Sequence, residues 1–218
     1  MPSREEENEA LARAEYWDAR YAKSDGKHAT HEWFRSYSDL QPFLEKHLFE
    51  PFPASQEPKI LHLGAGDSPL EKTVPRELLD RGYKNQTCVD FSPVVVKLMT
   101  ARNLEGVTWL CEDVRDMPVI ASDSIDVAFD KGTLDAMIHG SPWDPPEDVI
   151  ENSCRYMKEV ARALKPAGVF LYITYRQPHF VKPLLNQSDL WDMHMEVLNS
   201  SENSFEYCAF VLRKAQSA

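Results

Sequence analysis

The stretch Ile60-Leu61-His62-Leu63-Gly64-Ala65-Gly66-Asp67-Ser68 decides the fold. It predicts a short buried strand that ends in a glycine turn and leads into a helix. A second apolar run, 86–90, ends at Asp90, 24 residues after Gly66. Glycines let the backbone approach a ligand closely, and a carboxylate at the tip of the next strand can accept hydrogen bonds from both ribose hydroxyls. Together these features predict a nucleoside site.

Strand and helix patterns alternate through the middle of the chain. The last helix is predicted to end at Lys165-Pro166-Ala167-Gly168, because proline and glycine are stop signals. This alternation implies right-handed crossovers and an α/β fold with a doubly wound parallel sheet. The predicted strands are 59–63, 86–90, 107–112, 125–130 and 169–174, and the predicted helices are 69–81, 93–102 and 147–164.

The two ends of the chain follow different patterns. The segments 5–22 and 40–49 have good helix formers or apolar residues at helical spacing, which predicts N-terminal helices. Two strand patterns, 190–198 and 205–212, close the chain with only the polar turn 199–204 between them. We therefore expect a mostly parallel sheet with a C-terminal antiparallel hairpin, which differs from the plain dinucleotide fold.

Length and charge limit the classes of function. A chain of 218 residues is most simply one domain with a full core. The net charge of −11 would repel nucleic acid and suits a basic protein partner, although an acidic surface also simply keeps proteins soluble. The longest apolar stretch, 168–173, is too short to cross a membrane, and the acidic N-terminus has no signal-peptide pattern.

The cysteines indicate the compartment. No Cys-x-x-Cys or Cys/His spacing suggests a metal site, so no metal is expected. We interpret the four cysteines as reduced core thiols of a cytoplasmic protein. They are Cys88, Cys111, Cys154 and Cys208.

The residues around the glycine turn favour one nucleoside. A dinucleotide fingerprint needs a third glycine where this chain has Pro69, and a P-loop needs a Gly-Lys-Ser/Thr sequence that is missing. The turn contains no basic residue, and Asp67 and Glu71 flank it, so it suits a cation better than a pyrophosphate. S-adenosylmethionine has an adenosine, a positive sulfonium and no phosphate. A ligand-free strand–helix turn is the alternative that Gly-x-Gly alone leaves open.

A third carboxylate follows the third predicted strand. Asp113 lies just past that strand, where ligands of doubly wound sheets bind. It can accept from an adenine amino group, while the backbone N–H of Val114 can donate to a ring nitrogen. The alternative is a loop of solvated acids.

With these residues in place, the chain resembles class I S-adenosylmethionine-dependent methyltransferases. It is similar in particular to the eukaryotic lysine methyltransferases of translation elongation factor 1A, and within them to the small single-domain type. The resemblance spans roughly 15–214 and implies a Rossmann-like single domain, 1–218, with a helical lid (1–50), a cofactor-binding core (59–174) and an acceptor-side loop and β-hairpin (175–218). The segments that carry it are Tyr16-Trp17-Asp18-Ala19-Arg20-Tyr21, Glu32-Trp33-Phe34, Val89-Asp90-Phe91-Ser92-Pro93-Val94-Val95-Val96 and Phe129-Asp130-Lys131-Gly132-Thr133-Leu134-Asp135-Ala136.

The resemblance also implies a cofactor, S-adenosyl-L-methionine, which leaves as S-adenosyl-L-homocysteine. Each implied contact belongs to one part of that molecule. The contacts are Gly64, Ala65 and Gly66 under the methionine, Asp90 on the ribose, Phe91 near the adenine, Asp113 and Val114 at the adenine edge, Trp17, Tyr21 and Trp33 as a lid, and Lys131 by the methionine end.

The chemistry expected is in-line methyl transfer to a nitrogen nucleophile, most simply a lysine of a basic protein such as elongation factor 1A. Asp130 and Asp135 are predicted to orient the amine. His62 is interpreted as a core histidine, and His179 as a residue at the acceptor lip or a surface residue. The alternatives are a small-molecule N- or O-methyltransferase, a non-catalytic adenosylmethionine-binding scaffold and, least favoured, a nicotinamide dehydrogenase.

Overall fold

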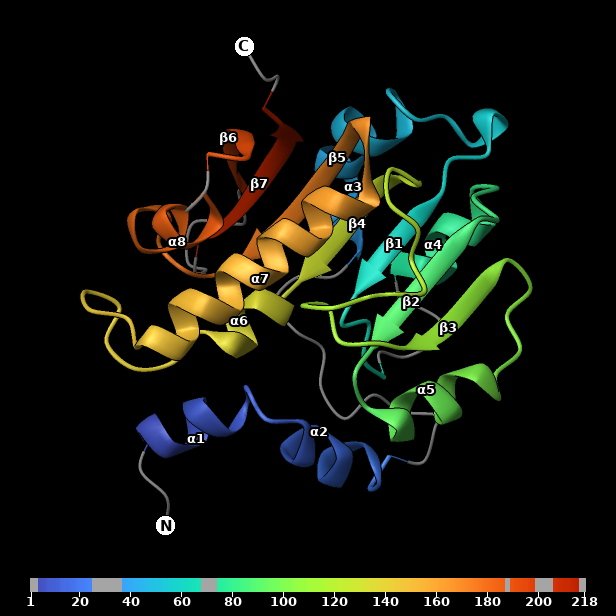
Figure 1. Cartoon of the computed structure of the whole chain (residues 1–218). Coiled ribbons are helices and arrows are strands. Elements are labelled where there is room, and N and C mark those ends of the chain that lie inside the picture. The colour runs from blue at the N-terminus through green and yellow to red at the C-terminus, as the bar shows by residue number, and fades with distance from the viewer. Residues whose placement is uncertain (1–3, 25–36, 68–73, 187–188, 199–205, 216–218) are drawn as a thin grey trace.

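The computed structural model describes residues 4–24, 37–67, 74–186, 189–198 and 206–215 (Figure 1). Within this part, one sheet of seven strands in the order β3-β2-β1-β4-β5-β7-β6 forms the centre of the molecule. Its first five strands pair in parallel, and β7 pairs antiparallel with both β5 and β6. The strands are β1 (Ile60–Leu63), β2 (Gln86–Asp90), β3 (Val107–Cys111), β4 (Ile125–Lys131), β5 (Leu164–Thr174), β6 (Trp191–Leu198) and β7 (Tyr207–Lys214).

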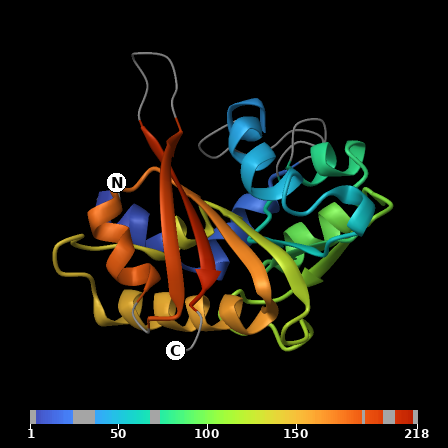
Figure 2. The same ribbon diagram turned by 90° about the horizontal axis from the view of Figure 1, so that it is seen from above.

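Helices cover both faces of this sheet (Figure 2). The N-terminal α1 and α2 instead lie across the end where the parallel strands finish (Figure 1). The helical elements are α1 (Arg4–Ala10), α2 (Ala14–Tyr21), α3 (Tyr37–Leu44), the π-helix η1 (Glu45–Phe49), the 3-10 turn η2 (Ala54–Gln56), α4 (Val74–Asp80), α5 (Pro93–Thr100), α6 (Thr133–Met137), α7 (Glu147–Ala163) and α8 (Pro178–Leu185).

Alternation along the strands fills two separate cores. Phe170 and Tyr172 of β5 pack with α7 and α8 on one face, while Leu171 and Ile173 pack with α3, η1 and α4 on the other. Successive side chains of a strand point to opposite faces, so a strand covered on both sides must be apolar throughout. This explains why the middle of the sheet has the continuous apolar runs from which the doubly wound fold was predicted.

The strand order predicts where a ligand binds. The chain proceeds outward from β1 through β2 to β3, then returns to add β4 on the other side of β1. In open α/β sheets a ligand binds beyond the carboxyl ends of the strands at such a switch point. The end of β1 is Leu63, which is followed by the glycine turn.

The predicted end of the last helix is confirmed to within one residue, but the strand predicted at 169–174 begins earlier, and residues 165–168 form a bulge within it. The helix α7 ends at Ala163, and Leu164 already has extended backbone angles and pairs with Ile125, so β5 begins at Leu164. The glycine at position 168 is explained by the close approach of β5 to β4 and not by a helix stop, because a Cβ there would lie 3.0 Å from the carbonyl oxygen of Ile125.

Other boundaries also differ from the predictions. The helix expected at 5–22 is two helices, and the indole N–H of Trp17 donates to the carbonyl of Leu11 in the break between them (2.7 Å). Residues 68–73 and 199–205, where a helix start and the hairpin turn were predicted, lie outside the described residues. All four cysteines are described and free, but Cys111 is exposed, contrary to the expected core thiol.

Candidate functional site

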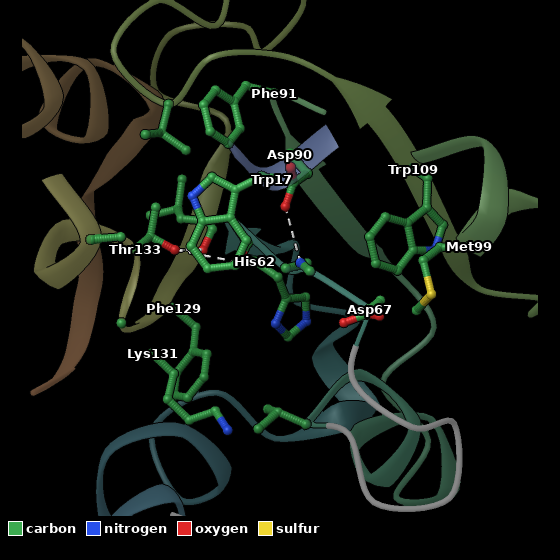
Figure 3. Close-up of a pocket in the computed structure, with 18 of the residues that line it drawn as sticks. Trp17, His62, Asp67, Asp90, Phe91, Met99, Trp109, Phe129, Lys131 and Thr133 are labelled. Carbon is green, nitrogen blue, oxygen red and sulfur yellow. Dashed lines mark hydrogen bonds between the residues drawn. The ribbon is translucent and has the colours of Figure 1, made fainter. Parts of the chain in front are cut away.

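A cavity lies at the carboxyl ends of β1, β2, β3 and β4, underneath α2 (Figure 3). It gathers residues that are far apart in the sequence. Trp109 and Met99 lie at one end of the view, and Phe129 and Lys131 lie at the other. The predicted site residues that line this cavity are Trp17, Tyr21, Gly64, Ala65, Gly66, Asp90, Phe91, Asp113, Val114 and Lys131. The predicted lid residue Trp33 lies outside the described residues.

The glycine turn is sterically required. Gly64 has φ +59 and Gly66 has φ +61, a region that favours glycine over other residues. A Cβ on Gly64 would lie 2.1 Å from Oγ1 of Thr133, and the Thr133 hydroxyl donates to the carbonyl of Leu63 (2.8 Å). At Gly66 the nearest atom to an added Cβ is the Tyr21 hydroxyl oxygen, at 3.2 Å. Thr133 of α6 therefore packs against the turn at Gly64, and Tyr21 lies close to the turn at Gly66.

Asp90, at the end of β2, holds the glycine turn in position relative to that strand. One carboxylate oxygen accepts from the backbone N–H of Gly66 and the other from that of Ser92, both at 3.0 Å. Burial raises the pKa of Asp90 to about 6, against the lowering effect of these hydrogen bonds. Each carboxylate oxygen has two acceptor positions, so the side chain can still accept two hydroxyl hydrogens from a ribose.

The N-terminal helices are tied to the sheet at this point. The hydroxyl of Ser92 donates to the carboxylate of Asp18 on α2 (2.5 Å) and also accepts from the N–H of Val95 at the start of α5. The rings of Trp17 and Tyr21 stack with centroids 5.6 Å apart and planes at 29°. Four residues apart on one helix, these aromatic rings form an apolar cover beside the glycine turn.

At the β3 end of the cavity, Asp113 is paired with a residue that the sequence analysis did not single out. The guanidinium of Arg115 donates to both oxygens of Asp113 at 2.6 to 3.1 Å, and its remaining end donates to Asn152. Burial raises the pKa of Asp113, but the hydrogen bonds from Arg115 outweigh this and hold it below its usual range. Asp113 is therefore an ionised, fixed acceptor. Neighbouring cavity walls are formed by Trp109 and Val114.

His62 lies on the floor of the cavity and is neutral. Its Nε2 is 2.8 Å from the side-chain oxygen of Gln86, whose amide donates to the carbonyls of Pro75 and Tyr83. Burial lowers the pKa of His62 to about 4. This arrangement fits the predicted core histidine, which serves here to shape the cavity.

Asp130 and Asp135, the two predicted acceptor-orienting residues, are not among the cavity-lining residues. Asp130 is fully buried and accepts from the N–H groups of Thr133 and Leu134 and from the hydroxyl of Tyr156. These contacts lie inside the protein, so the structure does not bring it into the cavity with the other predicted site residues. It instead caps α6 and holds Thr133 against the glycine turn.

Asp135 is likewise buried and lies outside the cavity lining. It accepts from the hydroxyls of Tyr172 (2.7 Å) and Thr174 (2.6 Å), and Arg176 lies 3.5 Å away. Burial raises the pKa of Asp135 to about 6. Asp135 therefore links α6 to the end of β5 as a positioning residue.

The buried Asp130 predicts a pH dependence of stability. Burial raises its pKa to about 7, above the unfolded value of about 3.9. The folded state therefore binds the proton of the Asp130 carboxyl more tightly than the unfolded state does. The stabilisation of the folded state that this proton provides at low pH is lost as the pH rises through about 7. Between about pH 5 and about pH 8, the wild type is expected to lose about 2 to 3 kcal/mol relative to Asp130→Asn, which is never charged. Urea denaturation of both proteins measures this difference, and an unchanged difference would contradict the buried ionisation.

Several cavity residues were not identified from the sequence. Thr133 packs against the glycine turn, but this contact between distant segments becomes visible only in the folded structure. Tyr37, Trp109 and Phe129 are ordinary apolar positions of a helix or strand, with no local signal. In the described part of the chain, no helix is long and apolar enough to cross a membrane, and no cluster of three potential metal ligands occurs.

Comparison with known proteins agrees with this geometry. The family model described as a methyltransferase domain matches residues 55–214. EEF1A lysine methyltransferase 4 of Mus musculus is 37% identical over 185 residues, which cover 82% of this chain and 67% of the mouse protein. The eEF1A lysine and N-terminal methyltransferase homolog of Drosophila pseudoobscura pseudoobscura is 32% identical over 81% of this chain, but only 24% of that protein is covered.

Among solved structures, a methyltransferase from Burkholderia thailandensis shares the fold. It is the 1,6-didemethyltoxoflavin-N1-methyltransferase, crystallised with its substrate and S-adenosylhomocysteine. The TM-score is 0.60 over 99% of this chain and 92% of the other, with 15% sequence identity. At this identity the likeness concerns the fold alone.

Proposed function

Because this chain belongs to the S-adenosylmethionine-dependent methyltransferases, in the family of the EEF1A lysine methyltransferases, we propose that it methylates a lysine of translation elongation factor 1A. The observation that carries the proposal is the 37% identity to the mouse EEF1A lysine methyltransferase 4, which extends over 82% of this chain. Similarity over that share of the chain extends beyond the glycine turn and supports a shared substrate class.

The cavity fits S-adenosylmethionine on its own chemistry. The turn at Gly66 leaves room that a side chain would reduce, since an added Cβ would lie 3.2 Å from the Tyr21 hydroxyl. The fixed acceptors are Asp90 and Asp113, and the guanidinium of Arg115 is already paired with Asp113. The turn 64–67 contains no basic residue and ends at Asp67, so a pyrophosphate would find no cation there, whereas a cationic sulfonium would be attracted.

We assign the cofactor-binding roles accordingly. Asp90 accepts the ribose hydroxyls, and Asp113 and the N–H of Val114 address the edge of the adenine, next to Phe91. The turn Gly64–Gly66 carries the methionine part, and Lys131 lies at the far end of the cavity to meet its carboxylate. The positions of these residues around the cavity support the assigned roles. When bound, S-adenosylmethionine supplies an activated methyl group with a good leaving group.

The remaining task of the protein is to align a neutral amine and exclude water. The unperturbed pKa of lysine is about 10.4, and both burial and a nearby positive charge lower it. Trp17 and Tyr21 cover the glycine turn with apolar surface, which keeps water out and favours the neutral amine. Asp135 and Arg176 fix the segments that border the acceptor side, so the protein contributes orientation.

Incubation with tritiated S-adenosylmethionine tests the proposed substrate. The recombinant enzyme is expected to label purified elongation factor 1A made in bacteria, and acid hydrolysis is expected to release the label as methyllysine. Asp90→Ala serves as the inactive control. Label recovered at the N-terminus, or only in small molecules from a cell extract, would contradict the assignment to lysine.

We further place the enzyme in the cytoplasm. Four free cysteines, one of them exposed at Cys111, suit a reducing compartment. Fractionation of cells that express the tagged protein checks this location.

A further inference from the structure

The loop between α6 and α7, residues 138–146, carries an unusually exposed tryptophan. Trp143 is 81% exposed, although a tryptophan side chain is ordinarily well covered. Its ring is nevertheless held in one orientation. It packs edge-on against Phe180, with centroids 4.8 Å apart and planes at 88°, and lies 5.9 Å from the ring of His179. An exposed ring that is already ordered loses little entropy when a partner covers it.

The loop itself is also held in shape. The guanidinium of Arg176 donates to the carbonyl of Ile138 (2.6 Å), and His139 contacts the carboxylate of Asp148 (3.1 Å). Gly140 has φ +70 and packs so closely that a Cβ would lie 2.7 Å from Pro146. These contacts hold the start of the loop, and the packing of Trp143 on Phe180 holds its middle.

This loop leaves the candidate active site along the chain, although none of its own residues lines the cavity. Ala136 and Met137 at the end of α6 line the cavity, and the loop follows them directly. On the same side, β5 ends at Thr174 and is followed by Tyr175, which is 50% exposed. The aromatic groups therefore lie beyond the ends of β4 and β5, away from the adenine side at β3.

The loop that carries Trp143 and the start of α7 are acidic. Residues 139–151 contain no lysine or arginine. The helix α1, with exposed Glu5, Glu6 and Glu7, lies on the same side of the molecule in both ribbon views (Figures 1 and 2). The exposed carboxylates of the loop and the start of α7 are Asp144, Glu147, Asp148 and Glu151.

We propose that Trp143, His179, Asp144 and Glu147, here called the acidic aromatic rim, bind a lysine- and arginine-rich segment of the protein substrate. Aromatic faces attract ammonium and guanidinium groups, and the carboxylates complement their charge. A large exposed aromatic side chain in a fixed position is typical of a binding hot spot. This inference rests on the proposed function and names the surface that selects a basic protein.

Initial rates of methyl transfer to elongation factor 1A test the rim. Trp143→Ser is expected to raise the KM for the protein about tenfold and to leave kcat within about twofold, because the ring acts in binding and not in chemistry. The double variant Asp144→Asn/Glu147→Gln is expected to raise KM about three- to tenfold, with the effect shrinking at high salt. The KM for S-adenosylmethionine is expected to stay the same.

Two matched controls lie elsewhere on the surface. Val119→Ser removes an apolar side chain that is 63% exposed in the β3–β4 connection. Glu50→Gln/Glu105→Gln removes two negative charges, as the rim double variant does, but from exposed positions before β1 and β3, at the opposite end of the sheet. Both controls are expected to retain the wild-type KM for the protein.

The outcomes separate the two proposals. If the wild type labels elongation factor 1A and the rim variants retain its KM, the rim is contradicted and the function stands. A fall in kcat alone, or an equal rise in KM in the controls, contradicts the rim as well. If the wild type transfers no label to elongation factor 1A, the proposed substrate is contradicted, and the rim with it.

Discussion

Replacing Asp90 with alanine is expected to weaken S-adenosylmethionine binding by at least about 100-fold, since each hydrogen bond to a charged group contributes about 1.5 to 3 kcal/mol and two ribose hydroxyls are involved. The variant also leaves the N–H groups of Gly66 and Ser92 without their acceptor. The glycine turn and the start of α5 therefore lose their common anchor. Equilibrium dialysis with labelled S-adenosylmethionine measures the dissociation constant.

Two further variants separate binding from folding. Asp90→Asn keeps the size and one acceptor oxygen and is expected to lose about 10-fold or more, because the charge is removed. Asp80→Ala removes a solvent-facing carboxylate that pairs with Arg76 on α4, and is expected to bind normally. Wild-type affinity in a folded Asp90→Ala protein would show that the carboxylate does not hold the nucleoside.

Gly64→Ala is expected to lower the free energy of unfolding by about 2 to 6 kcal/mol, from backbone strain and overpacking of about 1 to 3 kcal/mol each. The strain arises because Gly64 has φ +59, and the overpacking because the new Cβ would lie 2.1 Å from Oγ1 of Thr133. Neither group has room to withdraw, since Thr133 is held by Asp130 and by the carbonyl of Leu63. Urea denaturation measures the loss.

A double-mutant cycle identifies the cause. Thr133→Gly removes all three atoms nearest to the new Cβ. The double variant Gly64→Ala/Thr133→Gly is therefore expected to be more stable than the sum of the single effects predicts. Gly82→Ala is the control for strain alone, because Gly82 also has positive φ (+92) but its Cβ would meet only Ala54, at 3.6 Å. Strict additivity of Gly64→Ala and Thr133→Gly would contradict the steric role of Thr133.

The architecture was predictable because its signals are local. The apolar runs that end at Leu63 and Asp90 need burial on both faces, and the Gly64–Gly66 turn has a backbone requirement that can be recognised in the sequence. Adjacent strands that end together then bring Asp90 and Asp113 to one edge of the sheet. The same logic gave the antiparallel pair β6 and β7, since no crossover helix separates them.

The rest depends on contacts between distant segments, which no local pattern reveals. Lys165-Pro166-Ala167-Gly168 has the composition of a helix stop, and in the structure it bulges out of β5 between the pairs that Leu164 and Val169 make with β4. Asp130 and Asp135 follow a motif beside the site, yet Tyr156 and Tyr172 hold them inside the protein. The pairing of Arg115 with Asp113 is a matter of side-chain geometry.

Calorimetric titration of the wild-type chain tests the central claim, that the cavity beyond β1, β2 and β3 is an adenosylmethionine site. S-adenosylmethionine and S-adenosylhomocysteine are each expected to bind once per chain with a dissociation constant below about 100 μM, within the usual range for enzyme ligands. NAD⁺ is expected to give no heat of binding, because the carboxylates at the turn repel its pyrophosphate. Binding of NAD⁺, or no binding of either sulfur compound, would contradict the account.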